Sequence, residues 1–341
     1  MSDLRPFVRP VRVPESVPLE TAEPPVARAG EQGTWTFTFM PAEDVAGGWR
    51  LVLHNQGGRN NKHGFGGVSA RAVSARLEDG GELTAIEQDG VVALEVPESG
   101  LSQGAKIRVE LQAKAATASL DSKFLLLMPL APDEAIRAPS LDDEAQGCIA
   151  GACLVHITGA EKTALVAHAP SVVKAGEEVG LLVRPEDRYG NVACEAPGEL
   201  EVRLDSIKFP VTRAPVDGST CCRLEGIKLN EPGVYRLAVR EPESGLTCAT
   251  NPIRCEAGAP GRRVLWGYIH GHTEHSDGIG NIERYFEYMR DECGLDFGAP
   301  GDHDHLWETP DWIWARTKKV TPLMNEPGRF TTLLGYEWAK W

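Results

Sequence analysis

Short runs that alternate polar and apolar residues fill the first third of the chain, and they restrict its fold more than any other feature. Residues 34–39 (TWTFTF) and 106–111 (KIRVEL) alternate with period two, as half-buried strands do. Glycine-rich stretches such as 64–67 separate these runs, and no amphipathic helix of useful length is evident before residue 130. The pattern predicts an antiparallel β-sandwich over residues 31–135.

A second set of strand signals follows and predicts a second sandwich over residues 159–257. Its run at residues 181–192 ends in Gly190-Asn191, two residues that tolerate the positive φ of a turn. The series AGEEV, VRPEDRYGN and PGVYRL resembles filamin-type and bacterial immunoglobulin-like repeats over about ninety residues. This resemblance implies an immunoglobulin-like fold, in which Tyr235 pins a corner of the late strand, but it implies no activity.

The remaining segments before residue 258 lack periodicity. Residues 1–30 are rich in proline and are interpreted as an extended N-terminal arm. Residues 136–158 include an acidic, turn-rich stretch and are interpreted as a linker. A length of 341 residues allows this division into two or three domains, each with its own core.

Charge and hydropathy exclude some partners. The formal net charge of −14 argues against nucleic acid and against anionic membranes, since both require a cationic surface. No apolar run reaches the length of a membrane span, and the first residues lack the apolar core of a secretory signal. We therefore expect a cytoplasmic protein with reduced cysteines. Disulfides such as Cys148–Cys153 are the alternative if the protein is exported.

The pattern changes near residue 258. An apolar strand is predicted at residues 263–270, a helix begins after Asn281, and a second strand covers residues 295–300. A further helix at residues 310–319 and a strand at residues 331–336 complete the series. Strands that alternate with helices predict βαβ units with parallel pairing.

Five of the nine histidines lie between residues 270 and 305, interleaved with carboxylates. His270 and His272 are two apart on a strand, so their side chains share one face. Asp277 follows the same strand, His303 follows the second, and Glu337 follows the third. Because imidazole and carboxylate are the ligands of Zn, Mn and Fe sites, these five residues are the predicted metal ligands.

Other residues of this region keep more than one interpretation. His275 and His305 are metal ligands, proton shuttles or ordinary surface residues. The tryptophans at positions 307, 312, 314, 338 and 341 form an aromatic wall for a substrate or pack helices onto strands.

The motifs HGHT (270–273), SDG (276–278), GLDF (294–297) and DHD (302–304) resemble the polymerase and histidinol phosphatase (PHP) superfamily. This resemblance covers residues 258–341 and implies a distorted (β/α)₇ barrel with two or three divalent ions (Mn, Zn or Fe). Tyr268 stands where the family usually has an aspartate. The family's later ligands have no counterpart before Trp341. We therefore expect an incomplete (β/α) PHP-type barrel, from a fragment of a longer protein, after two antiparallel β-sandwiches.

The expected function is a metal-dependent hydrolase that acts on a small-molecule or phosphorylated substrate, most simply a phosphate ester. Hydrolysis of an amide or another carbonyl bond is the alternative within enzymes, because the same Lewis acid serves both reactions. A third hypothesis is a non-catalytic carbohydrate- or surface-binding protein with a degenerate PHP-like domain. The sequence predicts neither a general acid nor an oligomeric state.

Overall fold

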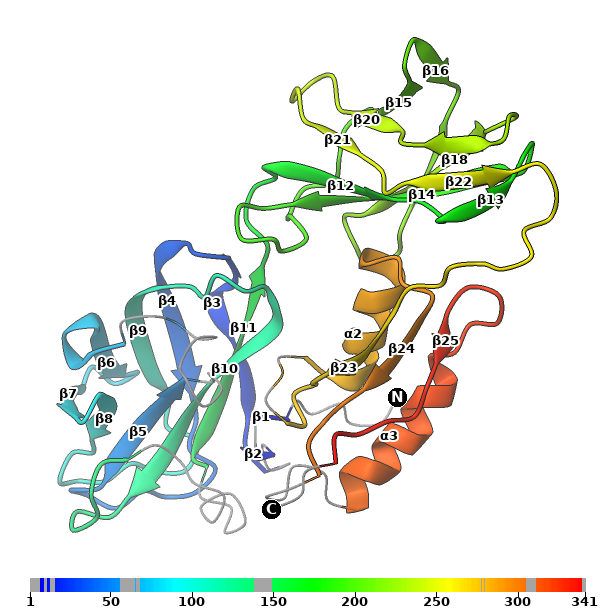
Figure 1. The fold of residues 1–341 in the computed structure, drawn as a ribbon. Coiled ribbons are helices and arrows are strands. Elements are labelled where there is room, and N and C mark those ends of the chain that lie inside the picture. The colour runs from blue at the N-terminus through cyan, green and yellow to red at the C-terminus, as the bar shows by residue number, and fades with distance from the viewer. Residues whose placement is uncertain are drawn as a thin grey trace. The chain divides into compact units, whose positions relative to one another are not determined.

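The computed structural model describes residues 7–8, 11–12, 16–55, 65, 68–137, 149–276, 278, 280–304 and 311–338 (Figure 1). The chain folds into two compact units. The first comprises Met1–Thr158 with Glu274–Asn281, and the second comprises Gly159–Thr273 with Ile282–Trp341. No helix in these described ranges is long and apolar enough to cross a membrane.

The first unit is built around a closed β-barrel with the strand order β10-β11-β3-β4-β9-β6-β7-β8-β5. Its strands are β3 (Leu19–Arg28), β4 (Gln32–Phe39), β5 (Arg50–Asn55), β6 (Val73–Leu77), β7 (Glu82–Gln88), β8 (Val91–Glu95), β9 (Ile107–Lys114), β10 (Leu120–Leu130) and β11 (Gly151–Thr158). A short hairpin, β1 (Phe7–Val8) and β2 (Val11–Arg12), and a 3₁₀ turn, η1 (Ala70–Ala72), complete the unit.

Alternation along the barrel strands separates the interior from the solvent. In β9 buried and exposed residues alternate without exception, and in β4 the side chains of Trp35, Phe37 and Phe39 are almost fully buried. Phe37 lies opposite Val109 in the ladder between these strands. Because successive side chains of a strand point to opposite faces, this pattern fills the barrel with apolar groups.

The predicted first sandwich is wrong, because its strands close into a ring. β5 pairs with both β8 and β10, and β11 pairs with β10 and, in parallel, with β3. Two closing strands, β3 and β11, lie in segments that the sequence assigned to an arm and a linker. Period-two alternation is common to sandwiches and barrels, so it does not reveal closure, which depends on pairings between strands far apart in the chain.

Residues 159–257 form short sheets around one apolar core in the second unit. The strands are β12 (Ala164–His168), β13 (Val172–Lys174), β14 (Glu178–Glu186), β15 (Glu201–Leu204), β16 (Ile207–Phe209), β17 (Thr212–Pro215), β18 (Cys222–Lys228), β19 (Gly233–Tyr235), β20 (Ala238–Arg240), β21 (Thr247–Ala249) and β22 (Ile253–Glu256). They assemble in the orders β12-β14-β18-β17, β13-β22-β19 and β16-β15-β20-β21. The hydroxyl of Tyr235 donates to the carbonyl of Glu231, 2.9 Å away, and ties the corner before β19.

The C-terminal segment of the second unit contains a three-stranded parallel sheet, β23-β24-β25. Its elements are β23 (Gly267–Gly271), α2 (Ile282–Glu287), the π-helical turn η2 (Tyr288–Glu292), β24 (Phe297–Pro300), α3 (Asp311–Leu323) and β25 (Thr331–Thr332). Helices follow the first two strands, as the predicted βαβ pattern requires. Ile282, Phe286 and Met289 pack with Val320 and Phe330 in a small core.

The predicted fold class is also wrong for this segment. Its three strands form an open sheet, and no (β/α) barrel is present among the described residues. Strands make up most of the regular secondary structure of the described residues, which contain only two α-helices, α2 and α3. Three strands cannot curve far enough to close a ring, whatever motif they carry.

Residues 159–257, called the sandwich below, and the C-terminal segment from residue 258 onward pack against each other within the second unit. The Arg184 guanidinium of β14 donates to the Tyr288 hydroxyl at 3.4 Å, and the indole N–H of Trp266 donates to Ser171 Oγ at 2.9 Å. The two segments, which the sequence divides at residue 258, therefore fold as one compact body.

Candidate metal centre

Three neighbouring parallel strands lead into the candidate site at one edge of the C-terminal sheet. His270 lies on β23 and His272 follows it directly, while His303 follows the end of β24 and Glu337 follows β25. Because the carboxyl ends of parallel strands meet at the same edge of a sheet, residues from far apart in the chain come together there. The register pairs Gly271 with Pro300, which sets the two strand ends side by side.

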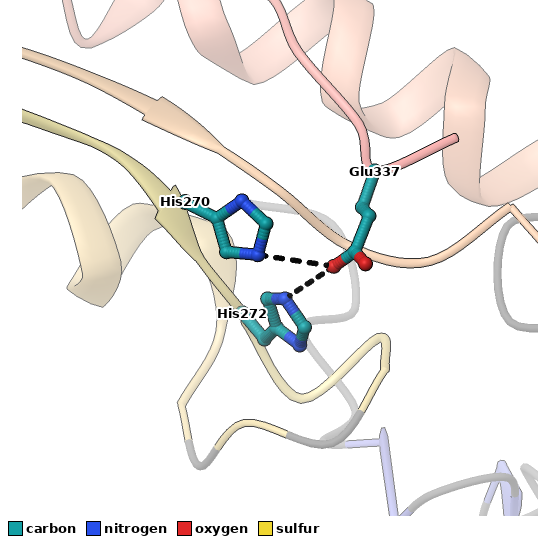
Figure 2. A group of neighbouring side chains, drawn as sticks. All are labelled: His270, His272 and Glu337. Atoms are coloured by element: carbon teal, nitrogen blue, oxygen red, sulfur yellow. Dashed lines mark hydrogen bonds and ion pairs between the residues drawn. The ribbon is translucent and has the colours of Figure 1, made fainter. Parts of the chain in front are cut away.

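The three imidazoles surround one carboxylate oxygen. Glu337 Oε2 lies 3.1 Å from Nε2 of His272, 3.3 Å from Nε2 of His270 and 3.5 Å from Nε2 of His303. Figure 2 shows that the rings of His270 and His272 both point toward this oxygen. Ligand atoms of His270, His272 and Glu337 all lie within 4.8 Å of one another.

These donor atoms fit a divalent cation. Ligands about 2.0 Å from a tetrahedral zinc ion are about 3.3 Å apart, and the three distances to Glu337 Oε2 bracket that value. Three imidazole nitrogens and one carboxylate oxygen are also a ligand set that Zn, Mn and Fe accept. The residues present therefore match the chemistry of a metal centre, and their distances to Glu337 Oε2 are compatible with one.

Backbone hydrogen bonds set the position of Glu337 beside His303. The N–H of Glu337 donates to the Asp302 carbonyl at 2.8 Å, and the N–H of Asp304 donates to the Glu337 carbonyl at 3.1 Å. These two bonds form an isolated parallel bridge between His303 and Glu337. The bridge extends the order of the sheet beyond β25 and brings the carboxylate to the histidines.

The buried carboxylate of Asp302 fixes the loop that follows His272. It accepts a hydrogen bond from the Thr273 backbone N–H at 2.7 Å and another from Thr273 Oγ1 at 2.8 Å. Both residues are almost fully buried. Hydrogen bonds to a buried ionised group are stronger than bonds between neutral groups, so this pair holds the end of β23 against the end of β24.

Gly271, the last residue of β23 and the residue between His270 and His272, allows Tyr285 of α2 to approach the sheet. A Cβ at Gly271 would lie 2.5 Å from the Tyr285 hydroxyl. That hydroxyl donates to the Ala299 carbonyl of β24 at 2.9 Å and is hydrogen-bonded by the Gly271 backbone. Burial raises the pKa of Tyr285, with a further contribution from Tyr268, so the phenol stays neutral and can donate.

The site opens to solvent on the side of His270. The His270 side chain is 70% exposed, whereas those of His272 and His303 are 17% and 19% exposed. A substrate or an exchangeable ligand can therefore reach the centre past His270, while the other two imidazoles form its inner wall.

The structure brings four of the five predicted ligands together, namely His270, His272, His303 and Glu337. Asp277, the fifth, lies outside the described residues, as does His305. His275 is buried in the turn Glu274–Ser276.

Tyr268, which the sequence comparison placed where PHP proteins usually have an aspartate, is 51% exposed. Its ring lies beside Gly271. Trp314, one of the tryptophans of this region, packs edge-on against Tyr336, with ring centroids 5.5 Å apart.

The sequence did not identify Tyr285 as a support of the site. Its only signal was its place on the apolar stripe of the predicted helix, which Ile282 and Phe286 share. A hydroxyl on that stripe needs a polar partner when it is buried, but the periodicity does not say which one.

No protein-family model matches this chain. An uncharacterized protein of Chlamydia trachomatis serovar D is 32% identical over 179 residues, a match that covers 50% of this chain and 28% of that protein. A second, from Chlamydia pneumoniae, is 29% identical over 177 residues with the same two coverages. The chain therefore matches less than one third of the length of these relatives.

Solved structures match only weakly. InvD of Yersinia pseudotuberculosis gives a TM-score of 0.34 at 13% identity, covering 72% of this chain and 60% of that chain. The C-terminal domain of the Streptococcus agalactiae AgI/II polypeptide BspA gives 0.25 at 8% identity, covering 68% and 94%. The Yersinia pseudotuberculosis adhesin InvE gives 0.21 at 13% identity, covering 77% and 62%. Structural similarity with TM-scores this low does not indicate a function for this chain.

Proposed function

We propose that His270, His272, His303 and Glu337 bind a divalent metal ion and that this centre serves a hydrolytic reaction. The observation that carries the proposal is the convergence of three imidazole nitrogens on one carboxylate oxygen at 3.1–3.5 Å. A divalent ion bound there supplies Lewis acidity, which makes water a nucleophile near neutral pH and polarises a phosphoryl or carbonyl group.

The chain's own residues supply position and access. The Asp302–Thr273 hydrogen bonds and the His303–Glu337 bridge orient the donors, so little reorganisation accompanies ion binding. The exposed edge at His270 leaves room for a substrate. The motifs at residues 270–273 and 302–304, similar to those of PHP enzymes, favour a phosphate ester over an amide or another carbonyl compound.

A non-catalytic, surface-binding protein is the second candidate function. Most strands of the described chain belong to a barrel and a sandwich, which have separate apolar cores and contribute no residue to the four-donor cluster. Tyr268 in place of an aspartate also favours it, because an outer support of the metal cluster is changed. In this proposal the ion has a structural role, and the β domains recognise a carbohydrate or another surface.

Metal affinity and turnover test these proposals together. We expect the purified chain to bind Zn²⁺ or Mn²⁺ with a stoichiometry of one or more in calorimetry. His272→Ala and Glu337→Gln should each weaken binding by about 100-fold or more, because even outer partners of ligands contribute 10–100-fold. His156→Ala is the matched control, since His156 is an exposed histidine of β11 outside the cluster. Absence of binding by the unaltered chain would refute the metal centre.

The substrate is tested with the metal-loaded protein. An aryl phosphate, an aryl ester and an anilide are compared, with His272→Ala as the inactive reference. Turnover of the phosphate alone supports the phosphoesterase, and turnover of the ester or anilide supports the carbonyl alternative. Stoichiometric metal without any turnover, together with carbohydrate binding that survives His272→Ala, would replace the hydrolase with the surface-binding function.

A further inference from the structure

A polar cavity of about 490 Å³ lies in the second unit, apart from the four metal-binding candidates. The sandwich contributes the turn at residues 215–219 and Arg223 of β18, and the C-terminal segment contributes residues of α2 and η2 together with Arg329. Its volume falls in the range of about 300–1,000 Å³ typical of small-molecule sites. Four arginines line it.

Three of the four arginines are paired with carboxylates of the wall. Arg284 Nη2 contacts both carboxylate oxygens of Glu292, at 3.0 and 2.9 Å. Arg290 contacts Asp291 at 2.7 Å, and Arg329 pairs with the same carboxylate. Asp291 and Glu292 are themselves buried, so these three guanidiniums are needed to neutralise the cavity wall.

Arg223 is the fourth arginine, and its guanidinium makes no hydrogen bond or close ion pair with the described residues. Burial lowers the pKa of Arg223, and the positive charge of Arg329 lowers it further, while Asp291 and Glu326 act in the opposite direction. Arg223 is half-buried, so its guanidinium is partly desolvated without a hydrogen-bonded partner among the described residues, and an anion in the cavity would compensate for that loss.

We propose that the cavity is a binding site for a small anionic molecule whose phosphate or carboxylate group is held by Arg223. A guanidinium presents a planar fork of donors that matches both groups in bidentate geometry. Asp217 and Glu287 also line the cavity, so the rest of the ligand carries hydroxyl or amino donors rather than further negative charge. Ser219 of the turn adds a hydroxyl to the wall.

A purely structural role for Arg223 makes a different prediction. If Arg223 holds β18 against the C-terminal segment through its attraction to Asp291, then removing its charge must destabilise the second unit. If it awaits an anion, then removal relieves repulsion with Arg329 and leaves the thermal midpoint unchanged or higher in buffer free of phosphate. The thermal midpoint of Arg223→Met therefore distinguishes the two roles before any ligand is added.

Calorimetric titration with inorganic phosphate and with acetate tests the binding itself. EDTA is present throughout, and His272→Ala is titrated in parallel, so that an ion at the metal centre cannot bind the anion instead. We expect binding that persists with EDTA and in His272→Ala, weakens at least tenfold in Arg223→Met, and weakens less in Arg223→Lys. Arg203→Met, at a partly exposed arginine of β15, is the matched control and should bind as the unaltered chain does.

The outcomes separate clearly. Arg223-dependent binding of phosphate but not acetate identifies a phosphorylated ligand, and the reverse identifies a carboxylate ligand. Binding of neither probe at millimolar concentration, binding unchanged in Arg223→Met, or a lowered thermal midpoint of Arg223→Met in anion-free buffer overturns the proposal.

Discussion

Replacing Gly271 by alanine tests whether the helix α2 sets the positions of His270 and His272. The added methyl group would lie 2.5 Å from the Tyr285 hydroxyl, 2.6 Å from Cε1 of Tyr268 and 2.9 Å from Cε2 of Tyr285. Ordinary van der Waals contact begins at 3.4 Å, so both rings must retreat. Tyr285 cannot move freely, because its hydroxyl is bonded to the Ala299 carbonyl of the neighbouring strand.

The expected cost combines steric strain with a lost hydrogen bond. Overpacking by one methyl group costs about 1–3 kcal/mol, and a neutral hydrogen bond contributes about 1 kcal/mol, so the free energy of unfolding of the second unit should fall by about 2–4 kcal/mol. The same displacement moves His270 and His272 relative to Glu337. Metal sites tolerate only about ±0.2 Å in ligand distance, so we expect metal affinity to fall at least about tenfold.

Urea unfolding followed by tryptophan fluorescence measures the first quantity, and calorimetric metal titration measures the second. Gly258→Ala is the control, because a Cβ at Gly258 meets no atom within 4 Å, and its unfolding free energy should change by less than about 0.5 kcal/mol. Adding Tyr285→Phe to Gly271→Ala removes the nearest atom, so the two changes should be non-additive. Full additivity, or a Gly271→Ala protein as stable as the control, would refute the contact between Gly271 and Tyr285 as the support of the site.

Two further predictions concern buried acids of the β domains. Burial alone would raise the pKa of Asp187, but hydrogen bonds from Asn191, Ala160 and Tyr189 hold it below the ordinary value. Asp187→Ala should therefore cost about 2–4 kcal/mol in urea unfolding at about pH 7. This difference should shrink as the pH falls below about 4, because the carboxylate of the unfolded chain is protonated there while that of the folded chain stays ionised to lower pH; an equal difference at acid pH would contradict this. Burial raises the pKa of Cys153 to about 12, so the unfolded chain loses its thiol proton first. The unfolding free energy of the barrel should fall by up to about 4 kcal/mol between pH ~9 and ~12, and that of Cys153→Val should fall less over the same range. If the unfolding free energies of the two proteins fell in parallel with pH, the thiol would not be responsible.

The candidate site was predicted largely from local rules. His270 and His272 are two residues apart on a strand, and His303 and Glu337 follow the next two strands of a βαβ series, so their meeting at one edge follows from strand periodicity and parallel pairing. The support from Tyr285 was not predicted. It depends on how closely α2 approaches β23, which is a property of three-dimensional packing.

The polar cavity around Arg223 could not be predicted from the sequence either. Arg223, Arg290 and Arg329 carry no motif, and nothing in their spacing indicates that they would line one space. Only the packing of the sandwich against the C-terminal segment reveals that two of these three are paired with Asp291 while Arg223 is not.

Alternation and turn residues, by themselves, determined that this chain is rich in strands, where many of the strands lie, and which histidines and carboxylate share an edge. These are short-range properties, encoded within a few residues of each strand. The tertiary structure alone decided that β3 and β11 close a barrel, that the C-terminal strands stay an open sheet, and that the sandwich joins them in one unit. These outcomes depend on pairings between residues that are distant in the chain, in the case of β3 with β11 more than a hundred positions apart, where local pattern carries no information about the partner.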